Sequence, residues 1–508
     1  MGTNTNEKRV LAKYDFRSKQ EYIYKTNRVR EIVGASEIIT FAYRDFFDAL
    51  KNDNIFVDFG DACIFEEKPA PRYVNKPDMV FDPEFRGDLS GKIIYVGGGN
   101  LYMLWKNEDV FKRASGILCK MLREKSYGLS AVCGKATYTG EYKKDMKTLN
   151  DDFEKRKVMT PPFIPTAMLP FTEIDRQTSL PVAHKRGGNG GDPLLKNNES
   201  ISEESYLKRQ MYKTTHGENP EFLDDMVAEK GSESLLAVIY IDGNNMGNRV
   251  SSIMDGISDY RTGVKTIRKL SNSIQEEFVS TPRKAIDEAA KTDHNMNDNI
   301  RWIVSGGDEI TFICNARAAL KIVGVYFKVL SGANGGKNTA CAGIAVFHSH
   351  FPFSKAYEIA EQCCENAKKV NRRNGSNKCI VDFQFIYSGV TGDLKSMRKQ
   401  DGDKMARPYL VSGTASELPS LKDDFILRAK RLRNIGRASI KDLSSTLFDS
   451  DSEYRFEIER LNAREPEAKL KDNLDGDKKC ILDIAQFYDM WFSKKAIPNM
   501  EEYYNDLF

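Results

Sequence analysis

The sequence predicts an α+β protein made of two copies of a βαββαβ unit, followed by a helical C-terminal region. Three observations predict it. Two apolar segments that end in an aspartate, 10–16 and 235–243, are each followed later by an apolar segment that leads into a glycine turn. The second copy alternates strand-like and helix-like patterns in the βαββαβ order. From about residue 415 onward the pattern is helical and charged.

The second copy can be followed element by element. After the apolar strand at 235–242, a long helical pattern places apolar residues on one recurring face: Ile253, Val264, Ile267, Leu270, Ile274 and Phe278. The remaining expected elements are strands at 301–305, 309–314, 339–347 and 378–386, and helices at 316–331 and 354–370.

The first copy starts with "VLAKYDF" (10–16) and has its glycine turn at the end of "KIIYVGGGN" (92–100). Between the copies, residues 186–234 are rich in Gly, Asn, Ser, Glu and Lys, which favours a flexible connection with one short helix. The expected domains are therefore 8–160, a connecting region 161–234 that is partly flexible, 235–412 and 413–508.

The composition is that of an ordinary globular chain. Its 508 residues are 40% hydrophobic and 29% charged, and a net charge of +3 does not indicate a nucleic-acid or membrane partner. Without a signal-like segment or a membrane-length apolar run, we expect a cytoplasmic protein. The nine cysteines include no C-x-x-C pair, which predicts reduced, buried thiols, and His348 and His350 lack further ligands at metal spacing.

The turn in "SGGDEITF" (305–312) marks the candidate site. Gly306 and Gly307 permit the positive φ angles of a tight hairpin between twisted strands. In a βαββαβ sheet the first and third strands are antiparallel neighbours, so Asp242 should arrive beside Asp308. Neighbouring strands lie about 4.8 Å apart, which lets carboxylates at adjacent strand ends share divalent ions. Oxygen ligands of this kind select Mg²⁺ or Mn²⁺.

The loop after Asp242 fits the same chemistry. Its sequence "DGNNMGN" (242–248) precedes a helix, where backbone N–H groups and the helix dipole attract a triphosphate. The alternative interpretation is two surface turns that carry acidic residues.

Together these residues resemble the large polymerase-cyclase subunit of type III CRISPR effector complexes, whose two palm domains are related to nucleotidyl cyclases. The similarity covers roughly residues 10–410. The segments that carry it are "YDFRSKQEYIYKTNRVREIVGASEII" (14–39), "YVGGGN" (95–100), "IDGNNMG" (241–247), "SGGDEI" (305–310), "FPFSKAYEIAEQCCENAKK" (351–369) and "RPY" (407–409). The resemblance implies two ferredoxin-like, nucleotidyl-cyclase-like palm domains.

The resemblance also implies a metal and nucleotide site in the second palm. The ligands of two Mg²⁺ or Mn²⁺ ions would be Asp242, Asp308, Glu309 and the carbonyl of Ile241. The residues that would bind nucleotide are Gly243, Asn245, Met246, Gly306, Gly307 and Lys368. A solvated helix-face lysine is the alternative interpretation of Lys368.

In the first palm, the turn residues Gly99 and Asn100 carry no carboxylate, so metal binding by Asp15 alone should be poor. Its expected task is to hold an acceptor nucleotide, with Ser36 or Asn100 contacting base or ribose.

The sequence departs from the family pattern at several positions. Glu309 replaces the second aspartate of the usual turn, and Asn244 stands where an aspartate is common. Residues 160–234 contain no zinc-binding cysteines. The first palm begins near residue 10, which leaves no room for the histidine-aspartate nuclease domain of the family and would exclude target-DNA cleavage by that route.

The function implied by the resemblance is conversion of ATP to a cyclic oligonucleotide messenger in antiviral defence. The alternatives are a non-catalytic nucleotide- or RNA-binding scaffold subunit and a diguanylate-cyclase-like enzyme that uses GTP. The implied partners are ATP, guide RNA and other CRISPR effector subunits, with a homodimer as a further option and no membrane. The basic stretch "RAKRLRNIGRASIK" (428–441) is either an RNA or partner contact or a solvated face.

Overall fold

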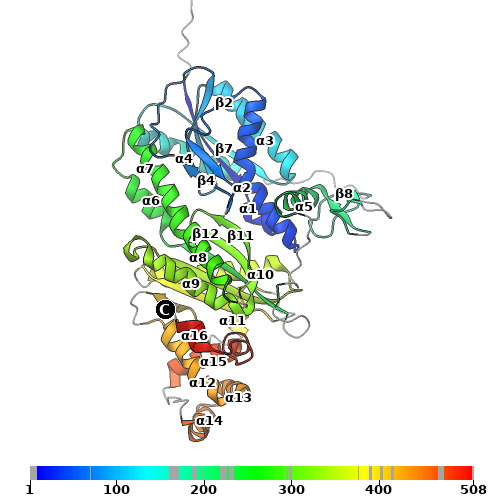
Figure 1. Cartoon of the computed structure of the whole chain (residues 1–508), viewed down its shortest axis with the longest axis vertical. Coiled ribbons are helices and arrows are strands. Elements are labelled where there is room, and N and C mark those ends of the chain that lie inside the picture. The colour runs from blue at the N-terminus through cyan, green and yellow to red at the C-terminus, as the bar shows by residue number, and fades with distance from the viewer. Residues whose placement is uncertain are drawn as a thin grey trace, which may run out of the picture. The chain divides into compact units, whose positions relative to one another are not determined.

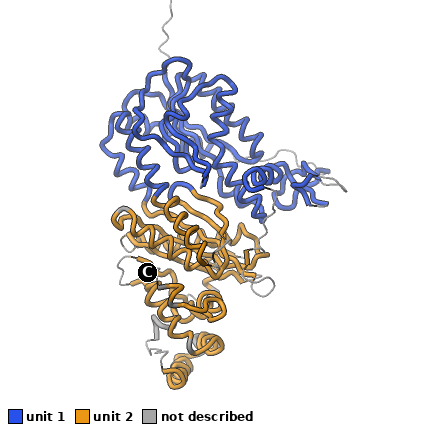
Figure 2. Tube along the Cα trace, viewed as in Figure 1, with its two compact units in different colours: residues 1–221, 246–276, 306–308 blue, residues 222–245, 277–305, 309–508 orange. Residues whose placement is uncertain are grey.

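The computed structural model forms two compact units, which Figure 2 colours separately. Unit 1 comprises residues 1–221, 246–276 and 306–308, and unit 2 comprises residues 222–245, 277–305 and 309–508. The residues that the structure describes are 8–68, 70–159, 171–185, 192–196, 198–217, 226–227, 234–293, 296, 300–373, 375, 377–387, 392–400, 404–412, 417–466 and 474–505.

The core of unit 1 is a five-stranded sheet with the strand order β2-β5-β6-β1-β7. Figure 1 labels β2 and β7 of this sheet. Its strands are β1 (Val10–Arg17), β2 (Phe56–Val57), β5 (Leu89–Gly97), β6 (Asn100–Trp105) and β7 (Ser130–Thr137). Two small hairpins accompany it, β3 (Cys63–Glu66) with β4 (Arg72–Asn75) and β8 (Val182–Lys185) with β9 (Ser200–Ser202). β1 pairs antiparallel with β6 and β7, so the apolar strand expected at 10–16 lies inside the sheet.

Seven α-helices are described in unit 1: α1 (Lys19–Tyr24), α2 (Val29–Asn52), α3 (Glu108–Ser126), α4 (Tyr142–Met159), α5 (Glu203–His216), α6 (Met246–Met254) and α7 (Tyr260–Gln275). α7 buries Val264, Ile267, Leu270 and Ile274, which confirms most of the predicted apolar face. Ile253 is 43% exposed and lies on the separate helix α6, so the single long helix predicted there is wrong.

α7 is fixed to β5 by a buried arginine. Arg268 donates hydrogen bonds to four backbone carbonyls, those of Ile93, Ile94, Lys76 and Met79, over 2.6–3.2 Å. Its side chain is almost fully buried. Because a buried guanidinium is stable only when its donors are satisfied, these bonds tie α7 to the first sheet.

The connecting region contains the one short helix that was expected, α5, and this helix packs tightly against α2. A Cβ on Gly34 of α2 would lie 1.9 Å from the carbonyl oxygen of Lys208, so only glycine fits at the crossing. Lys208 and Arg209 are fully buried, each 2.7–2.8 Å from a carboxylate, of Glu204 and Glu31 respectively. Charged residues of the segment that was predicted to be a flexible connection are therefore paired inside unit 1.

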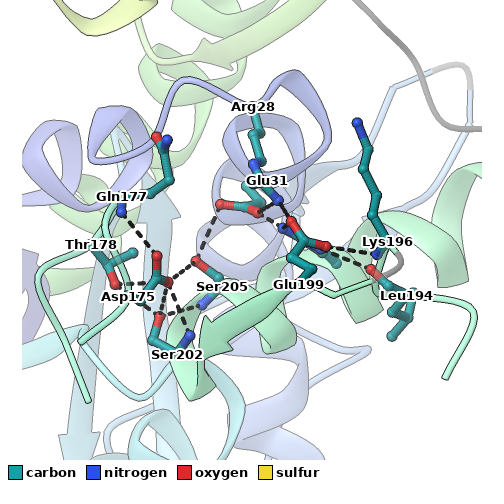
Figure 3. Close-up of polar contacts among 11 residues, drawn as sticks. Arg28, Glu31, Asp175, Gln177, Thr178, Leu194, Lys196, Glu199, Ser202 and Ser205 are labelled. Atoms are coloured by element: carbon teal, nitrogen blue, oxygen red, sulfur yellow. Dashed lines mark hydrogen bonds and ion pairs between the residues drawn. The ribbon is translucent and has the colours of Figure 1, made fainter. Parts of the chain in front are cut away.

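The segment that leads into α5 is organised by Asp175. Its carboxylate accepts hydrogen bonds from the backbone N–H of Ser202 at 3.0 Å and of Gln177 at 2.9 Å, and from the hydroxyls of Ser202 and Thr178 (Figure 3). Burial alone would raise the pKa of Asp175, but these hydrogen bonds outweigh it and the pKa is lowered.

Unit 2 contains a six-stranded sheet with the order β11-β12-β10-β13-β14-β15. Its strands are β10 (Leu235–Gly243), β11 (Ile300–Gly306), β12 (Glu309–Asn315), β13 (Ala340–His348), β14 (Cys379–Phe385) and β15 (Tyr409–Ser412). β10 pairs antiparallel with β12, which confirms the predicted pairing of the first and third strands, and its other antiparallel neighbour is β13. The order β11-β12-β10-β13 repeats β5-β6-β1-β7 of unit 1, so the duplication inferred from the sequence is confirmed.

The helices of unit 2 lie between these strands and in the C-terminal region. They are η2 (Glu276–Ser280, whose first residue belongs to unit 1), α8 (Thr281–Ala290), η3 (Ala316–Ala318), α9 (Ala319–Gly332), η4 (Ala333–Gly336), α10 (Phe353–Arg373), α11 (Leu394–Gln400), η5 (Leu421–Leu427), α12 (Arg428–Leu432), η6 (Arg433–Ile435), α13 (Arg437–Asp449), α14 (Asp451–Arg464), α15 (Leu474–Trp491) and α16 (Met500–Asn505). Aromatic contacts join α15 to the sheet, such as that between Phe383 and Trp491, whose ring centroids are 5.3 Å apart.

All nine cysteines are free thiols, and seven of them are buried as predicted. Cys119 is exposed and Cys133 is half-buried, so the prediction of buried thiols is wrong at these two positions. Each helix in the described part of the chain is too short or too polar to cross a membrane.

Candidate active site

The candidate site lies at the end of β10. Residues 236–241 of this strand are buried between β12 and β13, whereas Asp242 is partly exposed. Asn244 fixes the loop that follows: its side-chain N–H groups donate to the Thr339 hydroxyl at 3.1 Å and to the Lys378 carbonyl at 2.9 Å. Asn244 is therefore a structural residue of this loop.

The hairpin between β11 and β12 brings acidic residues to the same edge of the sheet. In the strand register Asp242 lies opposite Glu309, and Asp308 is the preceding residue, in the turn. Glu309, rather than Asp308, is thus the direct cross-strand partner of Asp242. Residues directly opposite in an antiparallel pair lie on the same face of the sheet, with their Cβ atoms about 4.5–5.5 Å apart. The side chains of Asp242 and Glu309 therefore share one site.

The two turn glycines differ in environment. Gly307 has a φ of +66°, which L side chains rarely adopt, and a Cβ there would lie 3.4 Å from Cα of Gly98. Its backbone N–H donates to the side-chain carbonyl of Gln275 at 3.0 Å. Gln275 already accepts this hydrogen bond. The Gly307 N–H could therefore contact a nucleotide only if the Gln275 side chain released it. A Cβ on Gly306 would meet nothing within 4 Å.

Lys368 of α10 contacts Asp242 directly. Its Nζ lies 2.5 Å from Oδ2 of Asp242 and 3.2 Å from the carbonyl oxygen of Gly243. The Lys368 side chain is only 13% exposed, so the interpretation as a solvated lysine is wrong. Burial alone would lower the pKa of Lys368, but the charge of Asp242 outweighs it and the pKa is raised.

Two residues near the site were missed by the sequence analysis. Burial, and then the charges of Glu309 and Asp242, raise the pKa of the Tyr240 phenol. Burial, and then the charges of Glu365, Glu358 and Asp242, raise the pKa of the Glu361 carboxyl. Glu361 lies two helical turns before Lys368 on α10, and this seven-residue spacing is the signal that could have identified it.

The loop predicted to bind phosphates runs from Gly243 to Met246. Asn245 adopts a positive φ of 54°, and Met246 is the first residue of α6. The carbonyl of Gly243 accepts from Lys368, so the loop and the lysine are already connected at the end of β10.

In unit 1, Asp15 of β1 is paired with a lysine. Lys19 Nζ lies 2.8 Å from Oδ1 of Asp15, and a Cβ on Gly99 would lie 2.6 Å from the same Nζ. Asn100 uses its side chain within the turn, donating to the Gly98 carbonyl at 2.9 Å. The ammonium group of Lys19 thus occupies the space where a turn carboxylate would stand.

Ser36 lies on α2. Tyr43 of the same helix donates its hydroxyl proton to the Gly99 carbonyl over 3.1 Å. Ser36 precedes Tyr43 by two turns, about 10 Å along the helix axis.

The donor chemistry at the end of β10 fits a hard divalent cation. Asp242 and Glu309 supply carboxylate oxygens, the ligands that Mg²⁺ and Mn²⁺ prefer. Within the described residues no group of three or more His, Cys, Asp or Glu side chains is arranged as a metal centre. Water and substrate oxygens would have to complete the coordination, as is usual for Mg²⁺.

The basic stretch 428–441 is partly neutralised by neighbours in unit 2. Arg437 and Lys441 lie 2.5 Å and 3.5 Å from the Asp489 carboxylate, and Arg428 lies 3.4 Å from Asp424. Ion pairs of this kind reduce the charge that the stretch can offer to a polyanion.

Comparison with known proteins gives the same assignment for the second copy. Residues 235–376 match the family model described as Cas10/Cmr2, second palm domain. A search of curated proteins finds no match.

Solved structures match over nearly the whole chain. The Csm1–Csm4 cassette in complex with cA4 aligns with a TM-score of 0.51 and 13% identity, covering 96% of this chain and 71% of that one. The complex with pppApApA gives 0.51 and 11%, covering 94% and 69%, and the apo cassette gives 0.50 and 10%, covering 95% and 70%. At these identities the likeness concerns the fold. Residues 235–376 are therefore similar to the second palm domain of Cas10/Cmr2, and the chain shares its fold with the Csm1–Csm4 cassettes.

Proposed function

We propose that this protein is a nucleotidyltransferase that converts ATP into a cyclic oligonucleotide messenger of CRISPR-type or related antiviral defence. The observation that carries the proposal is the position of Asp242 at the end of the inner strand β10. There it lies opposite Glu309 and contacts Lys368. The matching Csm1–Csm4 structures contain cA4 and pppApApA, which supports adenine nucleotides as substrate and product.

The acidic residues would hold two divalent cations. Asp242 and Glu309 would contribute facing carboxylates, and Asp308 and the Ile241 carbonyl complete the proposed ligand set. The chemistry that bound Mg²⁺ or Mn²⁺ supplies at such a site is activation of an attacking 3′-hydroxyl and stabilisation of the departing pyrophosphate.

The cationic and backbone groups would orient the triphosphate. The backbone N–H groups of Gly243, Asn245 and Met246 precede or begin a helix, where the dipole favours anions. When a cation balances the charge of Asp242, the ammonium group of Lys368 would leave the Asp242 carboxylate and contact a phosphate oxygen instead.

The first palm would take the acceptor nucleotide without binding a metal. Lys19 already balances the charge of Asp15 and is 30% exposed, so its ammonium group can also face an anion. Asn100 and Ser36 would contact base or ribose. Other CRISPR effector subunits are proposed partners, because the matching structures are Csm1–Csm4 cassettes, and guide RNA is proposed from the sequence resemblance.

The test is incubation of purified protein with ATP and Mn²⁺, with pyrophosphate measured by a coupled assay and products by mass spectrometry. We expect pyrophosphate and a cyclic oligoadenylate from the wild type, and loss of both in Asp242→Asn and Asp308→Ala. Glu358→Gln is the matched control, because this residue lies on α10 but is exposed and paired with Lys355 at 2.8 Å.

Two other outcomes would identify the alternatives. Consumption of GTP in place of ATP would indicate a diguanylate-cyclase-like enzyme. If the wild type and Asp308→Ala release equal, background pyrophosphate with both nucleotides, the protein is a non-catalytic subunit and the proposal is wrong.

A further inference from the structure

The loop that follows β10 is attached to the sheet one residue beyond the strand. Gly243 is the last residue of β10 and pairs with Ala340 of β13. The backbone N–H of Asn244 then donates to the carbonyl of Thr339 at 2.9 Å. The side-chain amide of Asn244 donates to the hydroxyl of the same threonine at 3.1 Å. Asn244 is therefore bound to Thr339 through both its backbone and its side chain.

A second asparagine, on α10, shares an acceptor with Asn244. The amide of Asn371 donates to the backbone carbonyl of Lys378 at 3.3 Å, and the amide of Asn244 donates to the same carbonyl at 2.9 Å. One carbonyl oxygen has two lone pairs, so it can accept both hydrogen bonds. We call Asn244, Asn371 and the Lys378 carbonyl the asparagine bridge. It connects the loop after β10 to α10.

α10 therefore reaches the end of β10 by two routes. The first is ionic: Lys368, three residues before Asn371, contacts Asp242 and the carbonyl of Gly243. The second is the asparagine bridge, which carries no charge. Only the first route would be given up when Lys368 turns to a phosphate.

Asn371 contributes a hydrogen-bond donor at a position where its acceptor is unused. The residue is 3% exposed, and its side-chain oxygen is buried without a hydrogen-bond partner among the residues that the structure describes. A buried acceptor without a partner lowers the stability of a fold, so a leucine of similar size would suit this interior position at least as well. What the asparagine adds over a leucine is the one N–H group that holds the Lys378 carbonyl.

We propose that Asn244 and Asn371 are positioning residues, which hold the loop after β10 against α10 while Lys368 leaves its carboxylate for a phosphate oxygen. The inference rests on the proposed function for the nature of the ligand, a nucleoside triphosphate. If Lys368 were the only connection, its departure would release the loop at the moment when the backbone N–H groups of residues 243–245 have to face the phosphates. The asparagine bridge keeps this backbone in place.

The role requires an amide at position 244. An aspartate there could accept a hydrogen bond from the Thr339 hydroxyl, but it could not donate one to the Lys378 carbonyl. The carboxylate and carbonyl oxygens would face each other without a proton between them, which is unfavourable for buried groups. Asn244 therefore acts on the site through the loop and not as a metal ligand.

Hydrogen exchange of the full chain without nucleotide tests the asparagine bridge directly. The backbone N–H of Asn244 is the reporter, because it is bonded to the Thr339 carbonyl and exchanges only when the loop opens. We expect Asn371→Leu to raise its exchange rate about 2- to 10-fold, which corresponds to a neutral hydrogen bond of about 0.5–1.4 kcal/mol. The thermal midpoint of this variant should be unchanged or higher. Thr339→Val should also raise the rate, and Thr339→Ser, which keeps the hydroxyl, should restore it.

A double-mutant cycle tests whether the two asparagines act together. Once Asn244→Ala has removed the contact from the loop, adding Asn371→Leu should not raise the exchange rate at position 244 any further. Tyr326→Phe is the matched control. It removes another buried hydrogen bond of unit 2, from the Tyr326 hydroxyl to the Phe278 carbonyl at 3.0 Å, and should leave the exchange at Asn244 unchanged.

Binding of a non-hydrolysable ATP analogue with Mn²⁺ tests the consequence for the site. Asn371→Leu should weaken it by the same factor of about 2 to 10. Asn244→Asp should weaken it too and should bind no additional Mn²⁺. If the wild type neither binds the analogue nor releases pyrophosphate from ATP, the proposed function is wrong, whereas the exchange rates still decide whether the asparagines hold the loop.

Any of four results would overturn the proposal. The first is an unchanged exchange rate at position 244 in both Asn371→Leu and Thr339→Val. The second is an equal effect of Asn371→Leu with and without Asn244→Ala, which would mean that Asn371 acts elsewhere in the fold. The third is faster exchange with undiminished binding of the analogue, which would make the contact purely structural. The fourth is an additional Mn²⁺ ion bound by Asn244→Asp at a wild-type exchange rate.

Discussion

Replacement of Lys368 by methionine should affect metal binding and nucleotide binding in opposite directions. Without nucleotide, the ammonium group of Lys368 lies 2.5 Å from the Asp242 carboxylate and competes with any cation for it. Unit charges at that distance attract by about 7 kcal/mol at an effective dielectric constant of about 20. Desolvation and partial exposure reduce the net value to about 1.5–3 kcal/mol, typical of a charged hydrogen bond. Mn²⁺ should therefore bind Lys368→Met about 10- to 100-fold more tightly than the wild type.

The assay is a titration of nucleotide-free protein with Mn²⁺, followed by the electron paramagnetic resonance signal of free Mn²⁺. The same variant should bind a non-hydrolysable ATP analogue more weakly, because the phosphate-facing charge is lost. Lys369→Met is the matched control, since Lys369 is the exposed neighbour on α10. Unchanged or weaker Mn²⁺ binding by Lys368→Met would refute the view that lysine and metal compete for Asp242.

Three further predictions concern the stability of unit 1. Gly34→Ala should destabilise it by about 3 kcal/mol or more in chemical denaturation, because the new Cβ would lie 1.9 Å from the Lys208 carbonyl. The control is Gly116→Ala at an open position of α3, which should stabilise it by up to about 1 kcal/mol. Arg268→Ala should cost about 3–5 kcal/mol, and Arg268→Lys should recover only part of it because an ammonium cannot reach four carbonyls. Asp175→Asn should lower the thermal midpoint at pH 7. Since the folded pKa of Asp175 is depressed, the wild-type advantage should be fully present above the unfolded pKa of about 3.8 and disappear as pH falls through the folded value.

The sheet architecture could be predicted from the sequence because its signals are local. Apolar runs of strand length and glycine turns gave β10, β12 and β13 within one residue of their ends, and helical periodicity gave α10 within three. The register at the site was less accessible, since a one-residue shift decides whether Asp308 or Glu309 lies opposite Asp242.

Tertiary pairing explains the other differences between prediction and structure. Lys208 and Arg209 are charged residues in a polar stretch, and nothing local indicates that Glu204 and Glu31 pair with them in the interior. Likewise, the ion pair between Lys368 and Asp242 joins residues 126 positions apart in the chain. The resemblance placed Lys368 at the nucleotide site, but its contact with Asp242 was not predicted, because i, i+4 patterns describe the faces of a helix and not the residues opposite them.

The two palms balance the same strand-end aspartate in different ways, and this difference leads to a last prediction. Lys19 follows Asp15 by four residues, and its Nζ would lie 2.6 Å from a side chain at position 99. Restoring carboxylates with Gly99→Asp and Asn100→Glu should therefore not create a Mn²⁺ site, because the lysine fills the space between them. Adding Lys19→Ala should create it, so the triple variant should bind more Mn²⁺ per chain than the double variant in the same resonance titration. Extra Mn²⁺ binding by the double variant would mean that Lys19 is displaced easily, and that its position does not explain why the first palm lacks a metal site.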